Sequence, residues 1–198
     1  MKRIAVFGTH GAAKTSLVYK LAAHFKMANK NVKVIHETAR QCPFPINQGA
    51  IYKTTLHLIS TQLTQELEAD AEGFEIAISD RTLYDAFIYI NFLGRGNEFT
   101  KHLEDFCMHW MKKYDVLVYL EPTEGYAITA DGVRCADVEY QMEIRDRFRD
   151  FVIDAQKYYG GTLNVIQEES NTIFDEEKCN ALMDNIRTSL FKEEAALV

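Results

Sequence analysis

Residues 8–16 read GTHGAAKTS, and the interpretation of the whole chain depends on this stretch. It fits the pattern G-x-x-x-x-G-K-[ST] of a phosphate-binding loop except at one position, because Ala13 stands where the pattern has its second glycine. The apolar run IAVF at 4–7 precedes it directly, and an amphipathic pattern over 14–29 follows. A strand, a glycine-containing turn and a helix in this order place backbone N–H groups around phosphate. We therefore predict a working phosphate loop.

Each conserved chemical group of such a loop has a counterpart in this stretch. Lys14 is expected to reach the β- and γ-phosphates, and the Thr15 hydroxyl is expected to bind Mg²⁺, with Ser16 beside it. Gly8 and Gly11 supply two flexible corners, and an alanine at 13 suits the first turn of a helix. His10 occupies a variable position and is expected to be a bystander rather than a base. The predicted nucleotide-binding residues are Gly8, His10, Gly11, Ala12, Ala13, Lys14, Thr15 and Ser16.

Short apolar runs alternate with helical patterns along the whole chain. The predicted strands are 4–7, 32–35, 75–79, 116–120 and 163–166, and the predicted helices are 14–29, 49–71, 82–93, 98–113, 137–159 and 175–192. Five strands separated by helices indicate a mostly parallel sheet that is covered on both faces. No repeat or linker divides the chain, so we predict one three-layer α/β domain over 1–198 with a polar lid segment around 121–137.

Two of the predicted helices carry apolar residues at helical spacing. The helix at 49–71 is expected to bury one face formed by Tyr52, Leu56, Ile59, Leu63 and Leu67. The helix at 137–159 is expected to bury Tyr140, Ile144, Phe148, Phe151 and Val152.

The composition is that of an ordinary globular protein, with 198 residues, 47% hydrophobic residues and 26% charged residues. The net charge of −7 disfavours a nucleic-acid or anionic-membrane partner, although it does not forbid a local basic cleft. The four cysteines are widely separated and form no C-x-x-C pair, which predicts neither a zinc site nor a redox pair. No signal peptide or membrane-spanning run is evident, so we expect a cytoplasmic protein.

Charged residues follow the predicted strands at the edge where parallel sheets bind ligands. Glu37 and Arg40 follow the second strand, Asp80 and Arg81 follow the third, and Glu121 follows the fourth. An aspartate at the end of an apolar strand is a natural partner for Mg²⁺. Taken singly, Glu37 and Asp80 could each cap a helix, and Arg81 could form an ion pair without chemical use. Together with the phosphate loop they favour a catalytic site.

Arginines also occur in and after the predicted lid. Arg134 lies within it, and an arginine on a closing lid can neutralise charge on a transferred phosphoryl group. Arg145 and Arg147 flank the apolar side of the next helix and fit a salt-bridged surface equally well. Arg149 faces away from that side, and we expect it to be only solvated. Arg134 is therefore the predicted lid residue.

Four strings of the sequence resemble the small P-loop kinases. They are GTHGAAKTS, ETAR at 37–40, SDRTLYD at 79–85 and DGVR at 131–134. The resemblance is greatest to the AAA-type ATPase/kinase group that includes ribosylnicotinamide kinase domains and phage-encoded P-loop kinases. It implies the strand order 2-3-1-4-5 and transfer of the ATP γ-phosphate with Mg²⁺.

The resemblance also implies roles for particular residues. By position, Glu37 would be the base for the acceptor hydroxyl, and Asp80 would assist with metal or acceptor. Arg81 would hold acceptor or phosphate, and Arg134 would act from the lid. Lys14 completes this predicted catalytic set.

The favoured hypothesis is a kinase for the hydroxyl or phosphate of a nucleoside-like or nucleotide-like acceptor. One alternative acceptor is a hydroxymethylated base within phage DNA. A nucleotide-dependent switch and an ATPase without acceptor are further alternatives, although the guanine-selecting element N-K-x-D is missing and the nearest string is NKNV at 29–32. The sequence leaves the acceptor, the preferred nucleotide base and the oligomeric state open, with a homodimer among the options.

Overall fold

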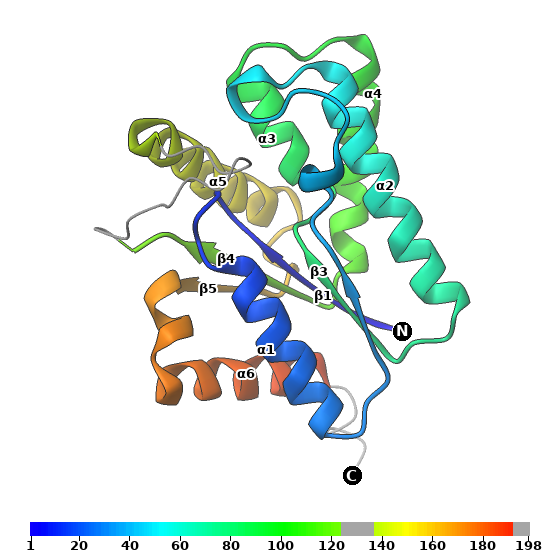
Figure 1. Ribbon diagram of the computed structural model, residues 1–198, viewed down its shortest axis with the longest axis vertical. Coiled ribbons are helices and arrows are strands. Elements are labelled where there is room, and N and C mark those ends of the chain that lie inside the picture. Colours follow the sequence, from blue (N-terminus) through cyan, green and yellow to red (C-terminus); the bar gives the residue numbers. More distant parts are fainter. Residues whose placement is uncertain (124–136, 192–198) are drawn as a thin grey trace.

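The computed structural model of this chain describes residues 1–123 and 137–191. Five parallel strands form one sheet in the order β2-β3-β1-β4-β5, which confirms the predicted order (Figure 1). The strands are β1 (Lys2–Phe7), β2 (Val32–Ile35), β3 (Ile76–Asp80), β4 (Val116–Glu121) and β5 (Val165–Glu169). β5 begins two residues later than predicted, because the N–H of Val165 donates to the Leu163 carbonyl at 3.1 Å in a local turn before the strand starts.

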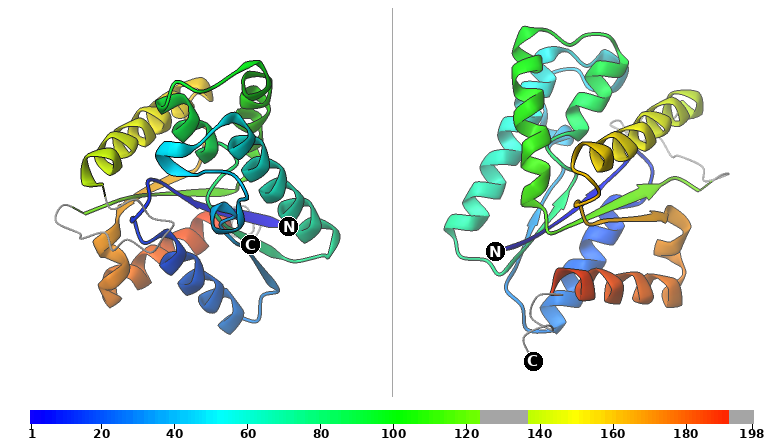
Figure 2. Two further views of the ribbon diagram at one scale, coloured as in Figure 1. Left: turned by 45° about the horizontal axis from the view of Figure 1, so that its top comes forward. Right: turned by 180° about the vertical axis from the view of Figure 1, so that it is seen from behind.

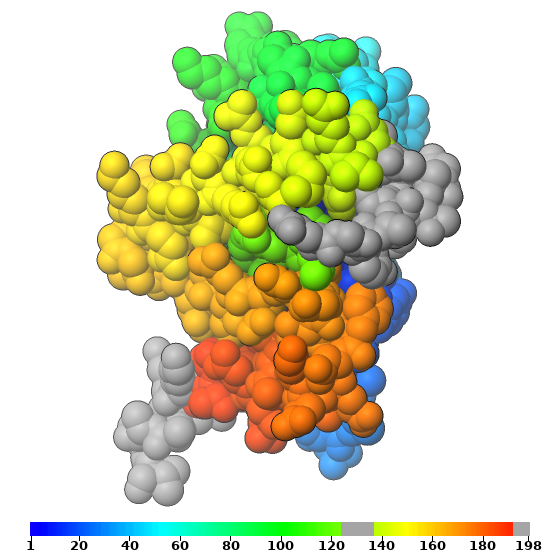
Figure 3. All heavy atoms as spheres, turned by 90° about the vertical axis from the view of Figure 1, so that its left-hand side faces the viewer, coloured from blue at the N-terminus to red at the C-terminus, as the bar shows by residue number. Residues whose placement is uncertain are grey.

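Helices cover both faces of the sheet, as the two views in Figure 2 show. The helices are α1 (Lys14–Met27), α2 (Tyr52–Ala71), α3 (Asp85–Phe92), α4 (Glu98–Trp110), α5 (Val138–Tyr158) and α6 (Glu176–Leu190). Short 3₁₀ turns lie at Ala39–Gln41, Asn47–Gly49, Met111–Lys113 and Ser170–Phe174. α1 and α6 pack on one face, and α2 to α5 pack on the other. In the space-filling view, α5 lies between α3 and α4 on one side and β5 with α6 on the other (Figure 3).

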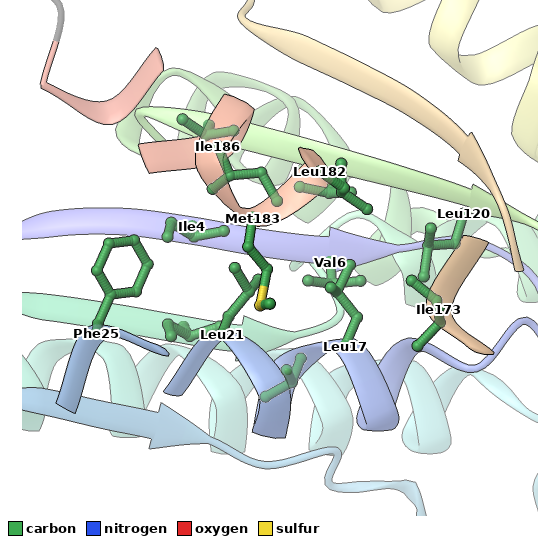
Figure 4. Close-up of a cluster of buried hydrophobic side chains, with 14 of the residues drawn as sticks. Ile4, Val6, Leu17, Leu21, Phe25, Leu120, Ile173, Leu182, Met183 and Ile186 are labelled. Atoms are coloured by element: carbon green, nitrogen blue, oxygen red, sulfur yellow. The ribbon is translucent and has the colours of Figure 1, made fainter. Parts of the chain in front are cut away.

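Alternate residues of β1 point into two separate cores. Ile4 and Val6 face α1 and α6, where they meet Leu17, Leu21, Phe25, Leu182, Met183 and Ile186 (Figure 4). Ala5 and Phe7 face α5, whose predicted apolar face is confirmed: Tyr140, Ile144, Phe148, Phe151 and Val152 are all buried. Successive side chains of β1 point to opposite faces of the sheet, and both faces are covered by helices. β1 therefore lies at the centre of the sheet.

The predicted apolar face of α2 was partly wrong. Only Ile59 of the five expected residues is fully buried, and Leu67 is 49% exposed. The buried side of α2 instead consists of Thr54, Thr55, Ile59, Gln62, Glu66 and Ala69. Polar side chains can occupy such a face because partners elsewhere in the fold satisfy their hydrogen bonds.

Among the described helices, none is long and apolar enough to cross a membrane.

Candidate functional site

The predicted phosphate loop joins β1 to α1 beyond the carboxyl end of β1. Its two glycine corners are confirmed by positive φ angles of 135° at Gly8 and 77° at Gly11. A Cβ on Gly8 would lie 2.3 Å from the carbonyl oxygen of Leu120, so that position also requires the close approach that only glycine permits.

Ala13 differs from its prediction. It does not lie in the first turn of α1 but is the residue before it, with φ 55° and ψ 22° in the left-handed region. An L-residue with a Cβ is strained there by about 1–2 kcal/mol. The missing glycine of the motif therefore leaves the loop conformation in place and adds backbone strain.

Replacing Ala13 by glycine should raise the free energy of unfolding by up to about 1 kcal/mol, because relief of the left-handed strain exceeds the added freedom of the unfolded chain. Urea denaturation would measure this change. Ala23→Gly in the exposed interior of α1 is the matched control, and we expect it to lower stability by about 1 kcal/mol. Equal destabilisation by both variants would contradict the strain at Ala13.

Lys14 is the first residue of α1 and is buried. Its Nζ donates to the Thr9 carbonyl at 2.6 Å, within the loop itself. Burial and then the nearby Arg81 guanidinium lower the pKa of Lys14 from 10.5 to about 8. Burial and Arg81 thus outweigh the carboxylates of Asp80, Glu37 and Asp85, and an added phosphate at the loop would stabilise the ammonium.

Affinity for ADP should be steady below pH 8 and should fall above it, because only protonated Lys14 attracts phosphate and its pKa is about 8. The loss should approach about tenfold per pH unit. Calorimetric titration of ADP between about pH 7 and 9.5 would test this prediction. In Lys14→Arg the charge persists, so any remaining affinity should not change with pH. A constant affinity of the parent protein over the same range would contradict the lowered pKa.

Asp80 is the last residue of β3 and lies level with Val6 of β1 in the sheet. Its Oδ2 accepts a hydrogen bond from Thr15 Oγ1 at 2.5 Å, which joins the strand end to the phosphate loop. Its Oδ1 is buried, and no donor among the described residues reaches it. A hydroxyl and a carboxylate with a free oxygen suit Mg²⁺, which usually takes one or two protein oxygens and fills its shell with water and phosphate. The described part of the chain contains no group of three or more metal-binding side chains.

Glu37 and Arg81 form a half-buried ion pair beside the loop. Arg81 donates to Glu37 Oε1 from Nε at 2.6 Å and from Nη2 at 2.5 Å. The Arg81 guanidinium lowers the pKa of Glu37 below its ordinary value, so this carboxyl is ionised at neutral pH. The backbone of Arg81 has φ 99°, a conformation that costs about 1–3 kcal/mol for a residue other than glycine. Strain of this kind is concentrated at functional sites.

Asp85 is a site residue to which the sequence analysis gave no role, although it closes the string SDRTLYD. It is buried, and its Oδ2 lies 3.5 Å from Arg81 Nη1. Its Oδ1 accepts from the backbone N–H and the hydroxyl of Thr82 at 3.1 and 2.6 Å. Arg81 is thus held between two carboxylates, one from the loop after β2 and one from α3.

Two neighbouring pockets meet at Arg81. The first, which we call the phosphate pocket, is lined by residues 10–16, Glu37, Arg40 and Arg81. The second, which we call the side pocket, is lined by residues of α2, α3 and the loops before them, including Thr55, Ile59, Gln62, Leu83, Asp85 and Tyr89. Arg81, Ala39, Ile46 and Asn47 line both. This arrangement gives space for a phosphate-bearing ligand and a second molecule next to each other.

His10 is buried in the loop near the rings of Tyr89 and Tyr140, with centroid distances of 6.5 and 5.6 Å. Its carbonyl accepts from Gln141 Nε2 at 2.7 Å, which ties the loop to α5. Burial and then Lys14 lower the pKa of His10 from 6.5 to about 4. The imidazole is therefore neutral at physiological pH.

The arginines of the predicted lid region have different outcomes. Arg134 lies outside the described residues, as does most of the predicted lid. The expectation that Arg149 is only solvated was wrong, because it donates to both carboxylate oxygens of Glu121 at 2.6 Å. Arg145 pairs with the adjacent Asp146 at 2.7 Å. Glu121 lies at the end of β4, as predicted, and its carboxylate is paired with Arg149 there.

Comparisons with known proteins agree with this fold. A family model described as an AAA domain matches residues 3–159. No curated protein matches the chain in sequence. Among solved structures, a deoxyadenosine kinase from M. mycoides with bound dATP has a TM-score of 0.64 and 15% identity over 94% of this chain and 100% of that chain. At this identity the likeness establishes the fold, which is that of the P-loop kinases.

Proposed function

This chain belongs to the AAA domain family, and we propose that it is an ATP- and Mg²⁺-dependent kinase of small molecules. It transfers the γ-phosphate of ATP to a hydroxyl of a nucleoside-like or nucleotide-like acceptor. The observation that carries the proposal is the meeting of the phosphate pocket and the side pocket at the Glu37–Arg81 pair. A simple ATPase or switch needs only the first of these pockets.

The phosphate pocket would hold the triphosphate. Backbone N–H groups of the loop and Lys14 bind the β- and γ-phosphates. Thr15 Oγ1 and Asp80 would hold Mg²⁺, which when bound neutralises charge on the phosphate oxygens. The free Oδ1 of Asp80 supports this assignment.

The side pocket would hold the acceptor. Its apolar surface, including Ile59 and Leu83, suits a ring, and Gln62, Asp85 and Tyr89 supply polar groups around it. The similar solved structure is a deoxyadenosine kinase, which favours a nucleoside-like ring over other alcohols.

Transfer relies mainly on position and charge. The oxygen of the acceptor hydroxyl attacks the γ-phosphorus, the bond from that phosphorus to the bridging oxygen of ADP breaks, and the hydroxyl proton passes to Glu37. Glu37 is a weak base because Arg81 lowers its pKa. A weak base is sufficient here, because the rate of phosphoryl transfer through a loose transition state depends little on the strength of the base. Arg81 stands at the boundary of both pockets, next to the group in transfer.

The test is ADP release from ATP·Mg²⁺ with a panel of acceptors. The panel comprises nucleosides, nucleoside monophosphates, nicotinamide riboside and DNA that contains hydroxymethyluracil. We expect ADP release that depends on a nucleoside-like acceptor and disappears in Lys14→Ala. If the DNA is the one member of the panel that supports turnover, the acceptor is a base within a polymer rather than a free small molecule. Nucleotide binding with no acceptor-dependent turnover across the panel would contradict the kinase and favour a switch.

A further inference from the structure

The carbonyl of Arg81 has an unusual partner for a residue at a strand end. It accepts a hydrogen bond from Gln62 Nε2 of α2 at 2.8 Å, while the N–H of Arg81 donates to Val6 of β1 at 2.9 Å. Gln62 lies 19 residues before Arg81 in the chain, so this contact comes from tertiary packing. The N–H and the carbonyl of Arg81, a residue with positive φ, are therefore both hydrogen-bonded to other segments of the chain.

Gln62 is in turn fixed by Glu66, one helical turn later. The same Nε2 donates to Glu66 Oε1 at 3.1 Å, so both neighbours of this atom are acceptor oxygens. Only the amide nitrogen, and not the amide oxygen, satisfies that position. Its two hydrogens are both used.

Glu66 is completely buried and is contacted by donors from three other segments of the chain. Tyr114 OH donates to Oε1 and Trp110 Nε1 donates to Oε2, each at 2.7 Å, and the Ser79 hydroxyl lies 3.5 Å from Oε1. Among the described residues, Glu66 forms no ion pair with a lysine, arginine or histidine. A buried carboxylate that is held only by neutral donors is expensive to maintain, and hydrophobic residues would fill the same space at less cost.

We infer that Gln62 and Glu66 are positioning residues of the active site, which hold the strained backbone of Arg81 so that its guanidinium stays between the two pockets. Glu66 orients the Gln62 amide, and the amide fixes the carbonyl of Arg81. The fixed peptide plane then sets the direction of the Cα–Cβ bond of Arg81. Glu37 and Asp85 then hold the far end of the same side chain. With one end released, the guanidinium no longer has a single position.

The catalytic part of this inference rests on the proposed function. Gln62→Met removes the donor while it keeps the length of the side chain, and Gln65→Met makes the same change three residues later on α2. We expect kcat of Gln62→Met to fall at least about tenfold, with the KM for ATP changed by less than about twofold. Gln65→Met should leave both unchanged. An unchanged kcat in a folded Gln62→Met protein would overturn the inference.

A double mutant separates positioning from general support of the fold. If Gln62 acts through Arg81, the Arg81→Ala/Gln62→Met protein should have the kcat of Arg81→Ala alone within about twofold. A role in stability alone predicts additive losses, and additivity would overturn the inference. Glu66→Gln puts an amide among donors and should act in the same direction as Gln62→Met.

A second readout does not depend on any activity. The Arg81 Nε–Hε group donates to Glu37, so its ¹⁵N-resolved resonance reports the side chain directly in the free protein. The signal, assigned by its loss in Arg81→Lys, should exchange with water at least about tenfold faster in Gln62→Met and not in Gln65→Met. Equal exchange in both would overturn the inference. If no acceptor supports turnover, the proposed function fails while this measurement still decides the role of Gln62.

Discussion

Asp80→Ala is expected to lower Mg²⁺-dependent ADP formation by about a thousandfold, because it removes the carboxylate through which the strand end holds the metal. Asp80 Oδ2 is bonded to Thr15 Oγ1, and its buried Oδ1 has no donor among the described residues. Without the carboxylate, the Thr15 hydroxyl is the one remaining side-chain ligand that we assign to Mg²⁺. Affinity for ADP measured without Mg²⁺ should change little, since Lys14 and the loop backbone are intact.

Two further variants make this result specific. Asp80→Asn keeps the shape and an oxygen for Thr15 but removes the charge, so it should raise the Mg²⁺ concentration that gives half-maximal rate. Asp154→Asn makes the same change at an exposed position on α5 and should behave like the parent. Steady-state rates over a range of Mg²⁺ concentrations would measure both. A parent-like Mg²⁺ dependence in Asp80→Asn would contradict the assignment of Asp80 to the metal.

The residue pattern was enough to predict that Lys14, Glu37, Asp80 and Arg81 meet at one edge of the sheet, whereas the strand order was implied by the resemblance to the P-loop kinases. Alternating apolar runs and helical patterns predict a parallel sheet, and such a sheet brings the carboxyl ends of its strands together. The roles assigned to these residues stay predictions, as does Arg134, which lies outside the described residues. The division of the chain into a single domain over 1–198 also stays a prediction.

The features that the sequence could not predict depend on contacts between distant segments. The polar face of α2 is an example, because Glu66 is satisfied by Tyr114, 48 residues later, and helical periodicity only ranks residues by their hydrophobicity. The Arg149–Glu121 pair spans 28 residues and was likewise missed. The left-handed Ala13 was missed for another reason: local propensity places alanine inside a helix, whereas the loop requires a turn conformation at that position.

Glu37→Gln is expected to lower kcat by about a hundredfold, because the amide cannot accept the proton of the acceptor hydroxyl. The substitution keeps an oxygen for Arg81, and Asp85 remains 3.5 Å from the same guanidinium, so the arginine is not left without a carboxylate. The KM for ATP should change by less than about threefold, since the nucleotide is held by the loop. The pKa of Glu37 lies below its ordinary value, so its carboxylate is present throughout the neutral range and this group should cause no acid limb there.

The matched control is Glu121→Gln, because Glu121 forms a comparable pair with Arg149 through two contacts of 2.6 Å but is absent from the lining of both pockets. Loss of that pair should cost little, as expected for an arginine that is 47% exposed, and kcat should stay within about twofold of the parent. Rates at saturating ATP and acceptor, with thermal unfolding of each variant, would separate chemistry from stability. Equal losses in the two variants would mean that Glu37 supports the fold rather than the transfer. A large loss in Glu37→Gln alone, in a protein as stable as the parent, would fit the transfer of the hydroxyl proton to this carboxylate.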